Sequence, residues 1–393
     1  MRILSTTMVA TAGIMLLAGQ AGAQDAAGVT AHRAANDGAF YGDSEYWTPE
    51  RRANAEPLPW NEEPILESDF LAPRAMAATR SRAVPGGAPD PEADLRASEE
   101  FPLEWNFDWD ETGDDDGSGD DRSLAPGGLG GGGGDEGEEE QGGTDFVGTY
   151  SAAARDVFDA FPVNRTGLLQ LEFPHRAMGK LNFRTGQGDA SCSASVISRN
   201  NVIVTAAHCC YDRTARQWNA LFTFTPAAAG TSAPYGVFPY EIAWVPTGWI
   251  NTGGRPNDVC VLRLRPNSAG RPVTFYTGWL GRSQNAQPTQ HHFAFGYPGN
   301  IDGGRFLQTC ASESFPLSSC GGTDTLNTGC NMTHGSSGGP WLLAYRPFES
   351  GPANYVNGVV SGRDLCTGPE GRVFNAARFT DRNIGSLCRS AGC

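Results

Sequence analysis

Short apolar runs separated by glycine- and proline-rich turns characterise the chain from about residue 165 onward. Runs of this length, rich in β-branched and aromatic residues and bounded by turn residues, are typical of β-strands. Many such strands at regular spacing predict an all-β domain of sandwich or barrel type. The segments that we expect as strands are residues 178–183, 191–198, 202–206, 221–225, 238–244, 258–264, 292–297, 341–345, 355–361 and 372–379.

Helical pattern is confined to two short stretches. We expect an entry helix at residues 152–161 and a closing helix at residues 381–388. No internal repeat is visible. The part from residue 148 to 393 is long enough for one well-buried core or for two small barrels.

The first 23 residues have the three parts of a secretory signal peptide. Arg2 provides a positive start, residues 8–18 an apolar core, and residues 21–23 a small-residue cleavage site. The apolar core is too short to span a bilayer, and no later stretch reaches about 18 uninterrupted apolar residues. We therefore expect a secreted protein, extracellular or periplasmic, whose mature form has no membrane segment.

Residues 24–147 differ sharply in composition from the C-terminal part of the chain. They contain 30 Asp and Glu against 8 Lys and Arg, a net charge of −22, and they include the glycine-rich run 127–134. A segment with low hydrophobicity and high charge buries too little surface to offset its chain entropy. We therefore expect a largely disordered acidic pro-segment or linker. Residues 46–51 and 105–109 are expected as short anchoring elements within it.

Residues 148–393 carry 20 Lys and Arg against 14 Asp and Glu, and they contain all ten cysteines of the chain. An even number of cysteines in an exported protein favours disulfides. A zinc site around residues 208–210 is the alternative, but it lacks the usual paired ligand spacing. We expect no metal, no cofactor and no nucleic-acid partner.

Candidate chemistry centres on the stretch Gly-Ser-Ser-Gly-Gly at residues 335–339. Ser337 lies between glycines, which permit a tight turn that exposes a hydroxyl and aims nearby N–H groups at one point. The stretch also fits the nucleophile elbow of α/β-hydrolases, but that fold requires a histidine after the serine. No histidine follows Ser337. The elbow is therefore excluded, and the chain order His, Asp, Ser remains.

His208 and Asp258 are the candidates for base and orienting acid. His208 ends a β-branched run, which places it at the end of a buried strand, and Asp258 opens another apolar run. Each residue alone has an ordinary interpretation, as a core histidine or as a turn cap. Together with Ser337 they have the residue types and the order that nucleophilic catalysis requires.

Three motifs resemble those of trypsin-like (chymotrypsin-fold) serine peptidases: Thr-Ala-Ala-His-Cys, Asp-Val-x-Val-Leu-x-Leu and Gly-x-Ser-Gly-Gly-Pro. Phe-Pro-His-Arg and Gly-Tyr-Pro, which begin at Phe173 and Gly296, are similar to the secreted bacterial, glutamyl-endopeptidase-like branch. The resemblance covers roughly residues 165–380. One departure is Ser336, which stands where the animal enzymes carry an acid, so activation by their N-terminal ion pair is not expected.

The resemblance implies two six-stranded antiparallel β-barrels with a C-terminal helix. It also implies His208 as general base, Asp258 as its orienter and Ser337 as nucleophile, with an oxyanion hole from the N–H groups of Gly335 and Ser337. The family pairs cysteines placed like Cys192 and Cys209. The further pairings that we expect are Cys330 with Cys366, Cys388 with Cys393, Cys310 with Cys320, and Cys210 with Cys260.

The family's specificity pocket would be framed by the residues before Ser337 and by residues 359–363. Asn331 replaces the acid that binds Lys or Arg in trypsin-like enzymes, and Val360 replaces the histidine of the glutamyl branch. Strict specificity of either kind is therefore not expected. His334 and Arg363 either add positive charge at the pocket mouth or are ordinary surface residues. The expected substrate-binding residues are Asn331, Met332, His334, Ser361 and Arg363.

The leading functional hypothesis is a secreted serine endopeptidase, made as a precursor and acting through an acyl-enzyme. The alternatives are an exported esterase with the same triad and an inactive, peptidase-like binding protein. The expected partners are a protein or peptide substrate and the chain's own acidic pro-segment, and the protein is expected to be a monomer.

Overall fold

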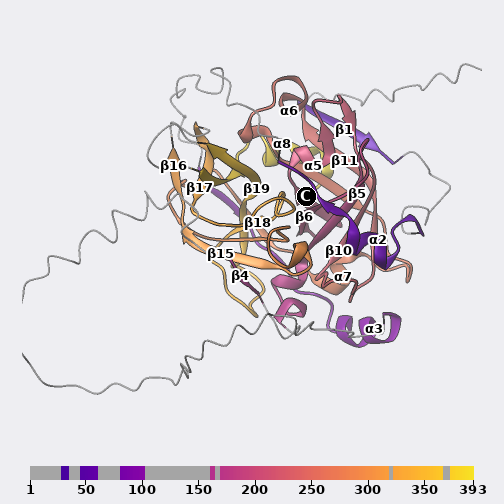
Figure 1. The fold of residues 1–393 in the computed structure, drawn as a ribbon. Coiled ribbons are helices and arrows are strands. Elements are labelled where there is room, and N and C mark those ends of the chain that lie inside the picture. Colours follow the sequence, from indigo (N-terminus) through magenta and orange to yellow (C-terminus); the bar gives the residue numbers. More distant parts are fainter. Residues whose placement is uncertain are drawn as a thin grey trace, which may run out of the picture.

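A computed structural model describes residues 28–34, 45–60, 80–101, 160–163, 169–317, 322–365 and 372–393 (Figure 1). Strands dominate the described residues and form two large sheets. The helices are short, and none among the described residues is long and apolar enough to cross a membrane. The prediction of an all-β fold is confirmed.

Six strands form a closed barrel. In ring order they are β5 (Met178–Arg184), β6 (Asp189–Ser198), β7 (Val202–Thr205), β12 (Cys260–Leu264), β11 (Phe238–Pro246) and β10 (Ala220–Pro226). Each pairs antiparallel with its neighbours, and β10 closes the ring onto β5. The barrel encloses fully buried side chains that include Leu181, Phe183, Phe222, Phe224 and Phe238.

The second sheet follows the barrel in the chain. Its strands are β13 (Gly281–Gln284), β14 (His291–Gly296), β15 (Gln308–Glu313), β16 (Phe315–Leu317), β17 (Gly322–Thr328), β18 (Pro340–Leu343), β19 (Tyr355–Leu365) and β20 (Arg372–Arg378). The short strand β4 (Phe161–Pro162) adds to β15. A smaller core lies against this sheet, in which the rings of Trp341 and Phe374 stack with centroids 5.7 Å apart.

All ten predicted strand segments coincide with observed strands, with shifts at their ends. Strand β12 begins two residues later than predicted, at Cys260, because Asp258 has left the extended conformation (φ −79°, ψ 58°). The C-terminal helix α8 (Ile384–Ala391) begins later than predicted, where the Asn383 side chain caps it. The predicted entry helix at 152–161 lies outside the described residues except for its end, where Phe161 belongs to a strand.

The remaining elements are short connections. They are α5 (Ala207–Cys210), α6 (Thr247–Thr252), α7 (Val273–Thr277), the hairpin of β8 (Tyr211–Asp212) and β9 (Gln217–Trp218), and the 3-10 turns Leu169–Leu171, His175–Ala177, Arg255–Asn257 and Asp302–Gly304.

Three stretches of the acidic N-terminal part belong to the folded unit. Strand β1 (Val29–Arg33) extends the barrel beside β11, β2 (Glu56–Pro57) pairs with β6, and β3 (Arg82–Val84) pairs with β13. Helices α2 (Pro49–Asn54) and α3 (Ala93–Glu100) accompany them. The sequence indicated only residues 46–51 of these stretches as an anchor. All of these stretches are ordered because edge pairing satisfies their backbone and apolar side chains bury into the protein.

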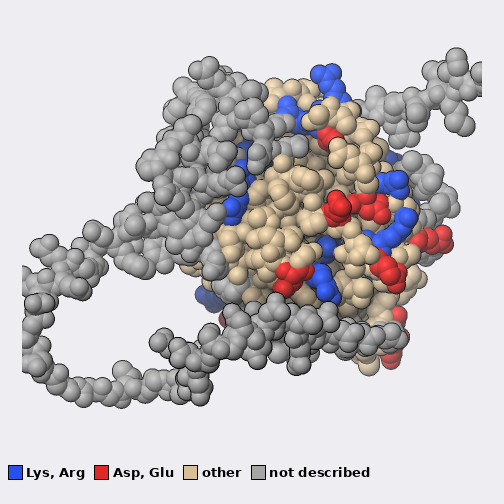
Figure 2. Space-filling view, in the orientation of Figure 1, with Lys and Arg blue, Asp and Glu red and all other residues tan. Residues whose placement is uncertain are grey.

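Apolar anchors and ion pairs hold these N-terminal stretches. The anchor predicted at residues 46–51 is confirmed, since Trp47 is fully buried and its indole donates to Leu221 O at 2.6 Å. The anchor predicted at residues 105–109 lies outside the described residues. Acid–base contacts also join the two parts of the chain, and Figure 2 shows both charge signs intermixed on one face. These acid–base contacts are Arg33–Glu241, Arg51–Asp189, Asp94–Arg176 and Glu100–Arg271.

Four disulfides lie within the described residues. The predicted pairs Cys192–Cys209, Cys210–Cys260 and Cys388–Cys393 are confirmed. The two remaining predictions, Cys310–Cys320 and Cys330–Cys366, are wrong, because Cys310 pairs with Cys330. The sheet brings these two Cα atoms within 6.1 Å inside its small core, and closeness in sequence does not decide the partner.

Candidate active site

His208 and Asp258 form a buried pair. Strand β7 ends one residue before Ala206, and α5 then turns the His208 ring toward the start of β12. The His208 Nδ1 lies 2.8 Å from Asp258 Oδ2, and the His208 backbone N–H donates to Oδ1 at 2.9 Å. One carboxylate thus holds both the ring and the backbone of the histidine. The sequence-based pairing of these two residues is reproduced in space.

The environment of Asp258 keeps the carboxylate ionised. The residue is fully buried, which by itself raises its pKa. The opposing effects are larger in sum: the charge and hydrogen bond of His208, a hydrogen bond from the Ser361 hydroxyl, and the nearby Arg255. Together they lower the pKa of Asp258 below its ordinary value. Arg255 also donates to the backbone oxygen of Ser361 at 2.9 Å and to its Oγ at 3.3 Å, so it fixes this hydroxyl in place.

The loop that carries Ser337 depends on glycines in the left-handed region. Gly335 has φ 87° and Gly338 has φ 80°. A Cβ atom at Gly338 would lie 1.9 Å from Thr205 Oγ1, so no other residue fits there without a shift. Within the described part of the chain, no hydrogen bond uses the backbone N–H of Gly335 or Ser337. Both donors therefore remain available beside the Ser337 hydroxyl.

Ser193 on β6 braces this loop, and sequence reasoning did not identify it. Its N–H donates to Ser337 O at 2.7 Å, and its hydroxyl donates to Gly335 O at 2.8 Å. The same hydroxyl accepts from the Tyr297 N–H at 2.9 Å. Ser193 thus ties the Ser337 loop to the barrel. A serine in a buried strand has no distinctive sequence signal, although the motif Gly-Tyr-Pro did single out Tyr297.

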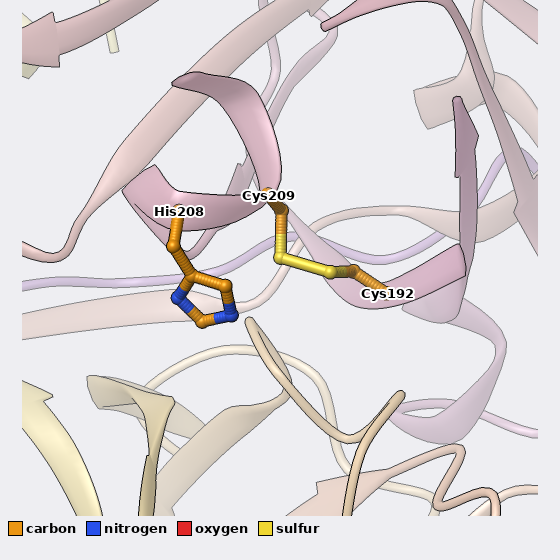
Figure 3. Close-up of side chains that lie close together, drawn as sticks. All are labelled: Cys192, His208 and Cys209. Atoms are coloured by element: carbon orange, nitrogen blue, oxygen red, sulfur yellow. A yellow bond between two sulfur atoms is a disulfide. The ribbon is translucent and has the colours of Figure 1, made fainter. Parts of the chain in front are cut away.

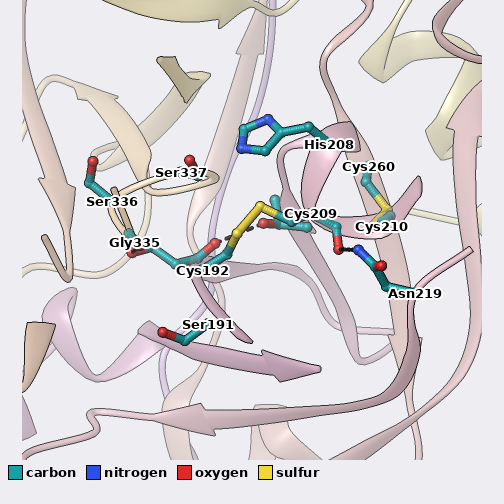
Figure 4. Close-up of a disulfide and its surroundings, with 12 residues drawn as sticks. Ser191, Cys192, His208, Cys209, Cys210, Asn219, Cys260, Gly335, Ser336 and Ser337 are labelled. Carbon is teal, nitrogen blue, oxygen red and sulfur yellow. Dashed lines mark hydrogen bonds between the residues drawn. A yellow bond between two sulfur atoms is a disulfide. The ribbon is translucent and has the colours of Figure 1, made fainter. Parts of the chain in front are cut away.

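The hydroxyl of Ser337 accepts a hydrogen bond from the indole of Trp60, with Nε1 at 2.8 Å from Oγ. The Nε2 atom of His208 is buried and has no partner among the described residues. Figure 4 shows the His208 ring and the Ser337 loop around the Cys192–Cys209 disulfide. The acid–base pair is therefore assembled, while the hydroxyl that it would deprotonate is engaged by Trp60. Trp60 belongs to the segment that the sequence predicted to be disordered.

Four residues expected to bind substrate lie near this loop. Met332 is buried in the small core, and the Asn331 side chain accepts from Ala160 N at 2.7 Å. The His334 Nδ1 accepts from the Trp60 backbone N–H at 3.0 Å. The half-buried Arg363 donates to Cys330 O.

The hydroxyl of the fifth residue, Ser361, points to Asp258 and not to the Ser337 loop. It donates to Asp258. Its contact therefore places it with the acid–base pair, behind His208, and the hydroxyl orients the carboxylate.

A closed six-stranded barrel and a second sheet define a chymotrypsin-like fold, in which the Asp258–His208 pair and the Ser337 loop form the candidate site. A profile of the trypsin family matches residues 171–381, which is more than half of the chain. The chain belongs to the trypsin family.

Comparison with individual proteins gives partial matches. An extracellular metalloprotease of Bacillus subtilis (strain 168) is 29% identical over 111 residues, 28% of this chain and 33% of that protein. The chain thus spans about a third of the length of this relative. Among solved structures, protease Anisep from Arthrobacter nicotinovorans has a TM-score of 0.48 at 25% identity, covering 55% of this chain and 95% of that one. The thermostable serine protease AL20 has a TM-score of 0.47 at 26% identity, covering 55% and 97%.

The name of the Bacillus relative implies a metal, and the described residues do not fit one. Within the described ranges, the group with metal-ligand spacing is Cys192, His208 and Cys209. Figure 3 shows that the two cysteines are joined in a disulfide, so neither sulfur is a thiolate ligand. His208 alone remains, and its Nδ1 already faces Asp258.

Proposed function

We propose that the protein is a secreted serine endopeptidase in which Ser337 is the nucleophile, His208 the general base and Asp258 its orienter. The observation that carries the proposal is the buried Asp258–His208 pair, with Nδ1 and Oδ2 2.8 Å apart, next to a glycine-flanked serine. Two unused backbone N–H groups beside that serine add support. Family membership agrees with this chemistry.

The reaction begins at the Ser337 hydroxyl. Its oxygen attacks the carbonyl carbon of the scissile peptide bond while His208 Nε2 takes the proton. The carbonyl oxygen becomes an oxyanion, and the N–H groups of Gly335 and Ser337 donate hydrogen bonds to it. His208 then gives the proton to the leaving amine, the carbon–nitrogen bond breaks, and an acyl-enzyme remains. Water attacks this ester by the same route in reverse, which releases the acid and restores the serine.

Asp258 makes His208 competent for this proton transfer. By accepting a hydrogen bond from Nδ1–H, the carboxylate leaves Nε2 as the free lone pair that removes the proton. Its negative charge stabilises the imidazolium that forms. The lowered pKa of Asp258 means that the carboxylate is present throughout the neutral pH range.

We also propose the cellular setting from the sequence. Residues 1–23 act as the signal peptide, residues 24–147 as a pro-segment that contacts the enzyme domain, and residues 148–393 as that domain. The substrate is a peptide or protein, and the enzyme works as a monomer without a cofactor. N-terminal sequencing of the secreted form tests both processing points.

Substitutions in the triad test the chemistry. Ser337→Ala and His208→Ala are each expected to reduce peptide hydrolysis by roughly 10⁶-fold without unfolding the protein. Asp258→Asn is expected to cost about 10⁴-fold, because it mis-sets the imidazole tautomer. The rates are measured on casein and, in parallel, on a short-chain ester, after removal of the N-terminal segment. Near-normal turnover by Ser337→Ala would exclude the assignment, and hydrolysis of the ester alone would indicate an esterase.

A further inference from the structure

Trp60 lies in the candidate active site although it belongs to the acidic N-terminal part of the chain. Its side chain is only 9% exposed, and its indole N–H points at the Ser337 hydroxyl. Its backbone N–H donates to His334, three residues before Ser337 in the chain. One residue thus contacts both the nucleophile and the loop that leads to it.

The indole packs into an apolar cluster of the second sheet. It belongs to the buried cluster that includes Met332, Val360 and Phe374, and its ring centroid is 6.3 Å from that of Phe374. His334 forms the outer edge, with its ring inclined at 67° and 5.1 Å away. The half-buried Arg363 lies at the border of this cluster, where it donates to the backbone oxygen of Cys330. The other buried members of the cluster are Ala294, Cys310, Leu326, Cys330, Trp341 and Ala376.

The residues before Trp60 lie across the front of the same site. Strand β2 pairs with β6, and the Leu58 N–H donates to Ser191 O at 3.0 Å. The Pro57 ring lies so close to Gly335 that a Cβ atom there would be 3.0 Å from it. Residues 55–60 therefore cover the approach to the nucleophile loop as well as its pocket.

Trp60 fills the site without being presented for cleavage. The atom that meets Ser337 Oγ is an indole nitrogen, which is not an electrophile. The hydrogen bond also engages the serine, and His208 Nε2 has no partner within the described residues. A side chain held in this way blocks substrate and leaves the triad incomplete.

We propose that the pocket filled by Trp60 is the primary substrate pocket, that it takes an aromatic side chain, and that residues 55–60 are its intramolecular inhibitor. The proposal rests on the proposed peptidase function. Shape and chemistry carry it: the pocket holds a bicyclic aromatic ring against apolar walls. A charged head group placed among these apolar side chains would lose its hydration, whereas an aromatic ring would not.

The inhibitor is tethered, so it competes strongly with any free substrate. Trp47 fixes the segment thirteen positions earlier in the chain, where its indole donates to Leu221 O. A short tether gives the attached side chain an effective concentration in the millimolar range or above. Cleavage or release of the segment is then needed before the enzyme reaches full activity.

Three variants of the full-length protein test the inhibition. Trp60→Ala empties the pocket, Trp60→Phe keeps a ring but removes the N–H donor, and Phe348→Ala removes an exposed aromatic ring as a control. Against a Phe-containing peptide, Trp60→Ala is expected to raise kcat/KM by about tenfold or more, mainly through a lower KM. Trp60→Phe is expected to stay mostly inhibited, and Phe348→Ala to match the parent. Thermal unfolding confirms that each variant is folded.

The pocket itself is tested with free indole and with matched peptides. Indole is expected to inhibit Trp60→Ala competitively and to have at least roughly tenfold less effect on the parent protein, whose pocket is occupied. Peptides with Phe, Leu, Glu or Arg before the scissile bond are expected to be cleaved by Trp60→Ala in the order Phe, Leu, then Glu and Arg. Fastest cleavage after Arg or Glu would overturn the aromatic preference.

The outcomes separate this proposal from the peptidase function. If all variants cleave peptides and Trp60→Ala has the same kcat/KM as the parent protein, the proposed inhibition is wrong and the proposed peptidase function is supported. If no variant cleaves any peptide, the peptidase is wrong. Calorimetry then tests the pocket independently of catalysis. Binding of indole to Trp60→Ala but not to the parent protein supports the proposed pocket, and equal heats of binding for both proteins contradict it.

Discussion

Ser193 illustrates how one ordinary residue holds the loop of a proposed nucleophile in place. Its three hydrogen bonds reach Ser337 O, Gly335 O and the Tyr297 N–H, so they link the nucleophile loop to the barrel on one side and to the second sheet on the other. The Ser193 hydroxyl makes two of these bonds. Its loss would leave a buried carbonyl and a buried N–H unsatisfied, which costs about 1–3 kcal/mol for each group.

Removing the Ser193 hydroxyl tests this brace. Ser193→Ala is expected to lower kcat by roughly tenfold to a hundredfold with little change in KM, because the Gly335 N–H would leave the position that the oxyanion requires. Ser195→Ala is the matched control, since Ser195 lies on the same strand and its buried hydroxyl has no partner among the described residues. The parameters are measured on variants that lack residues 1–60. A fall in kcat equal to that of Ser195→Ala would contradict a positioning role.

At the scale of single residues, the sequence predicts the roles of those residues whose chemistry is distinctive. His208, Asp258 and Ser337 were recognisable because nucleophilic catalysis needs these types in a restricted order. Ser193 and Trp60 were missed, since a buried serine and a tryptophan in an acidic stretch have many ordinary uses. Their roles depend on contacts that the chain makes only when folded.

Among the elements, α5 and β12 matter most for the site. His208 lies on α5, Asp258 lies two residues before β12, and the disulfide Cys210–Cys260 joins the two elements. This disulfide closes a loop with a sequence separation of 50, whereas Cys388–Cys393 closes one of 5. In the chain-entropy account, the longer loop contributes more stability, because its closure removes more freedom from the unfolded chain.

These two disulfides are expected to differ in their effect on stability and activity. Replacing both Cys210 and Cys260 by alanine is expected to lower the free energy of unfolding by about 4 kcal/mol, against about 2 kcal/mol for the Cys388 and Cys393 pair. Only the first replacement is expected to reduce activity, since it frees the segments next to His208 and Asp258, the proposed base and its orienter. Denaturant unfolding and peptide hydrolysis of both double variants give the comparison. Equal losses of stability would contradict the loop-length argument.

At the scale of elements, the positions of the strands were predictable from the sequence. The exact ends of the strands and the disulfide partners were less predictable. Every predicted strand was found because its apolar run reflects local burial. The late start of β12 follows from a long-range demand, since Asp258 turns aside to reach His208. The exchange of partners at Cys310 and Cys330 likewise follows from sheet packing.

In the whole molecule, two buried histidines couple stability to pH. His175 packs between Leu169 O and the Tyr345 hydroxyl, and His292 lies among Gln290 O, Ser314 and Asn357. Burial lowers the pKa of each from 6.5 to about 4. The folded state therefore binds fewer protons than the unfolded state between pH 6.5 and about 4, so stability falls as the pH falls through this window.

The pH dependence of unfolding is expected to have that sign. The free energy of unfolding is expected to drop between pH 6.5 and 4 by on the order of 3 kcal/mol for each buried histidine. His292→Gln is expected to flatten the profile by about half, at some loss of stability at pH 7. Unfolding is measured in a Ser337→Ala background to prevent self-digestion. A profile that is as steep in His292→Gln as in the parent would remove His292 from this coupling.

The sequence by itself determined the class of fold, the strand segments and the three residues of the candidate triad. These features depend on the local sequence, that is, on the periodicity of apolar residues, on turn residues and on the types of reactive side chains. The tertiary structure decided that residues 55–60 lie in the site, that Cys310 joins Cys330, and that Ser193 supports the nucleophile loop. The physical reason is the separation of the contacting residues along the chain. Trp60 and Ser337 are 277 positions apart, and only the packed sheets bring their atoms into contact. Net charge indicated a solvated tail, while a few buried anchors such as Trp47 were enough to fold parts of it onto the protein.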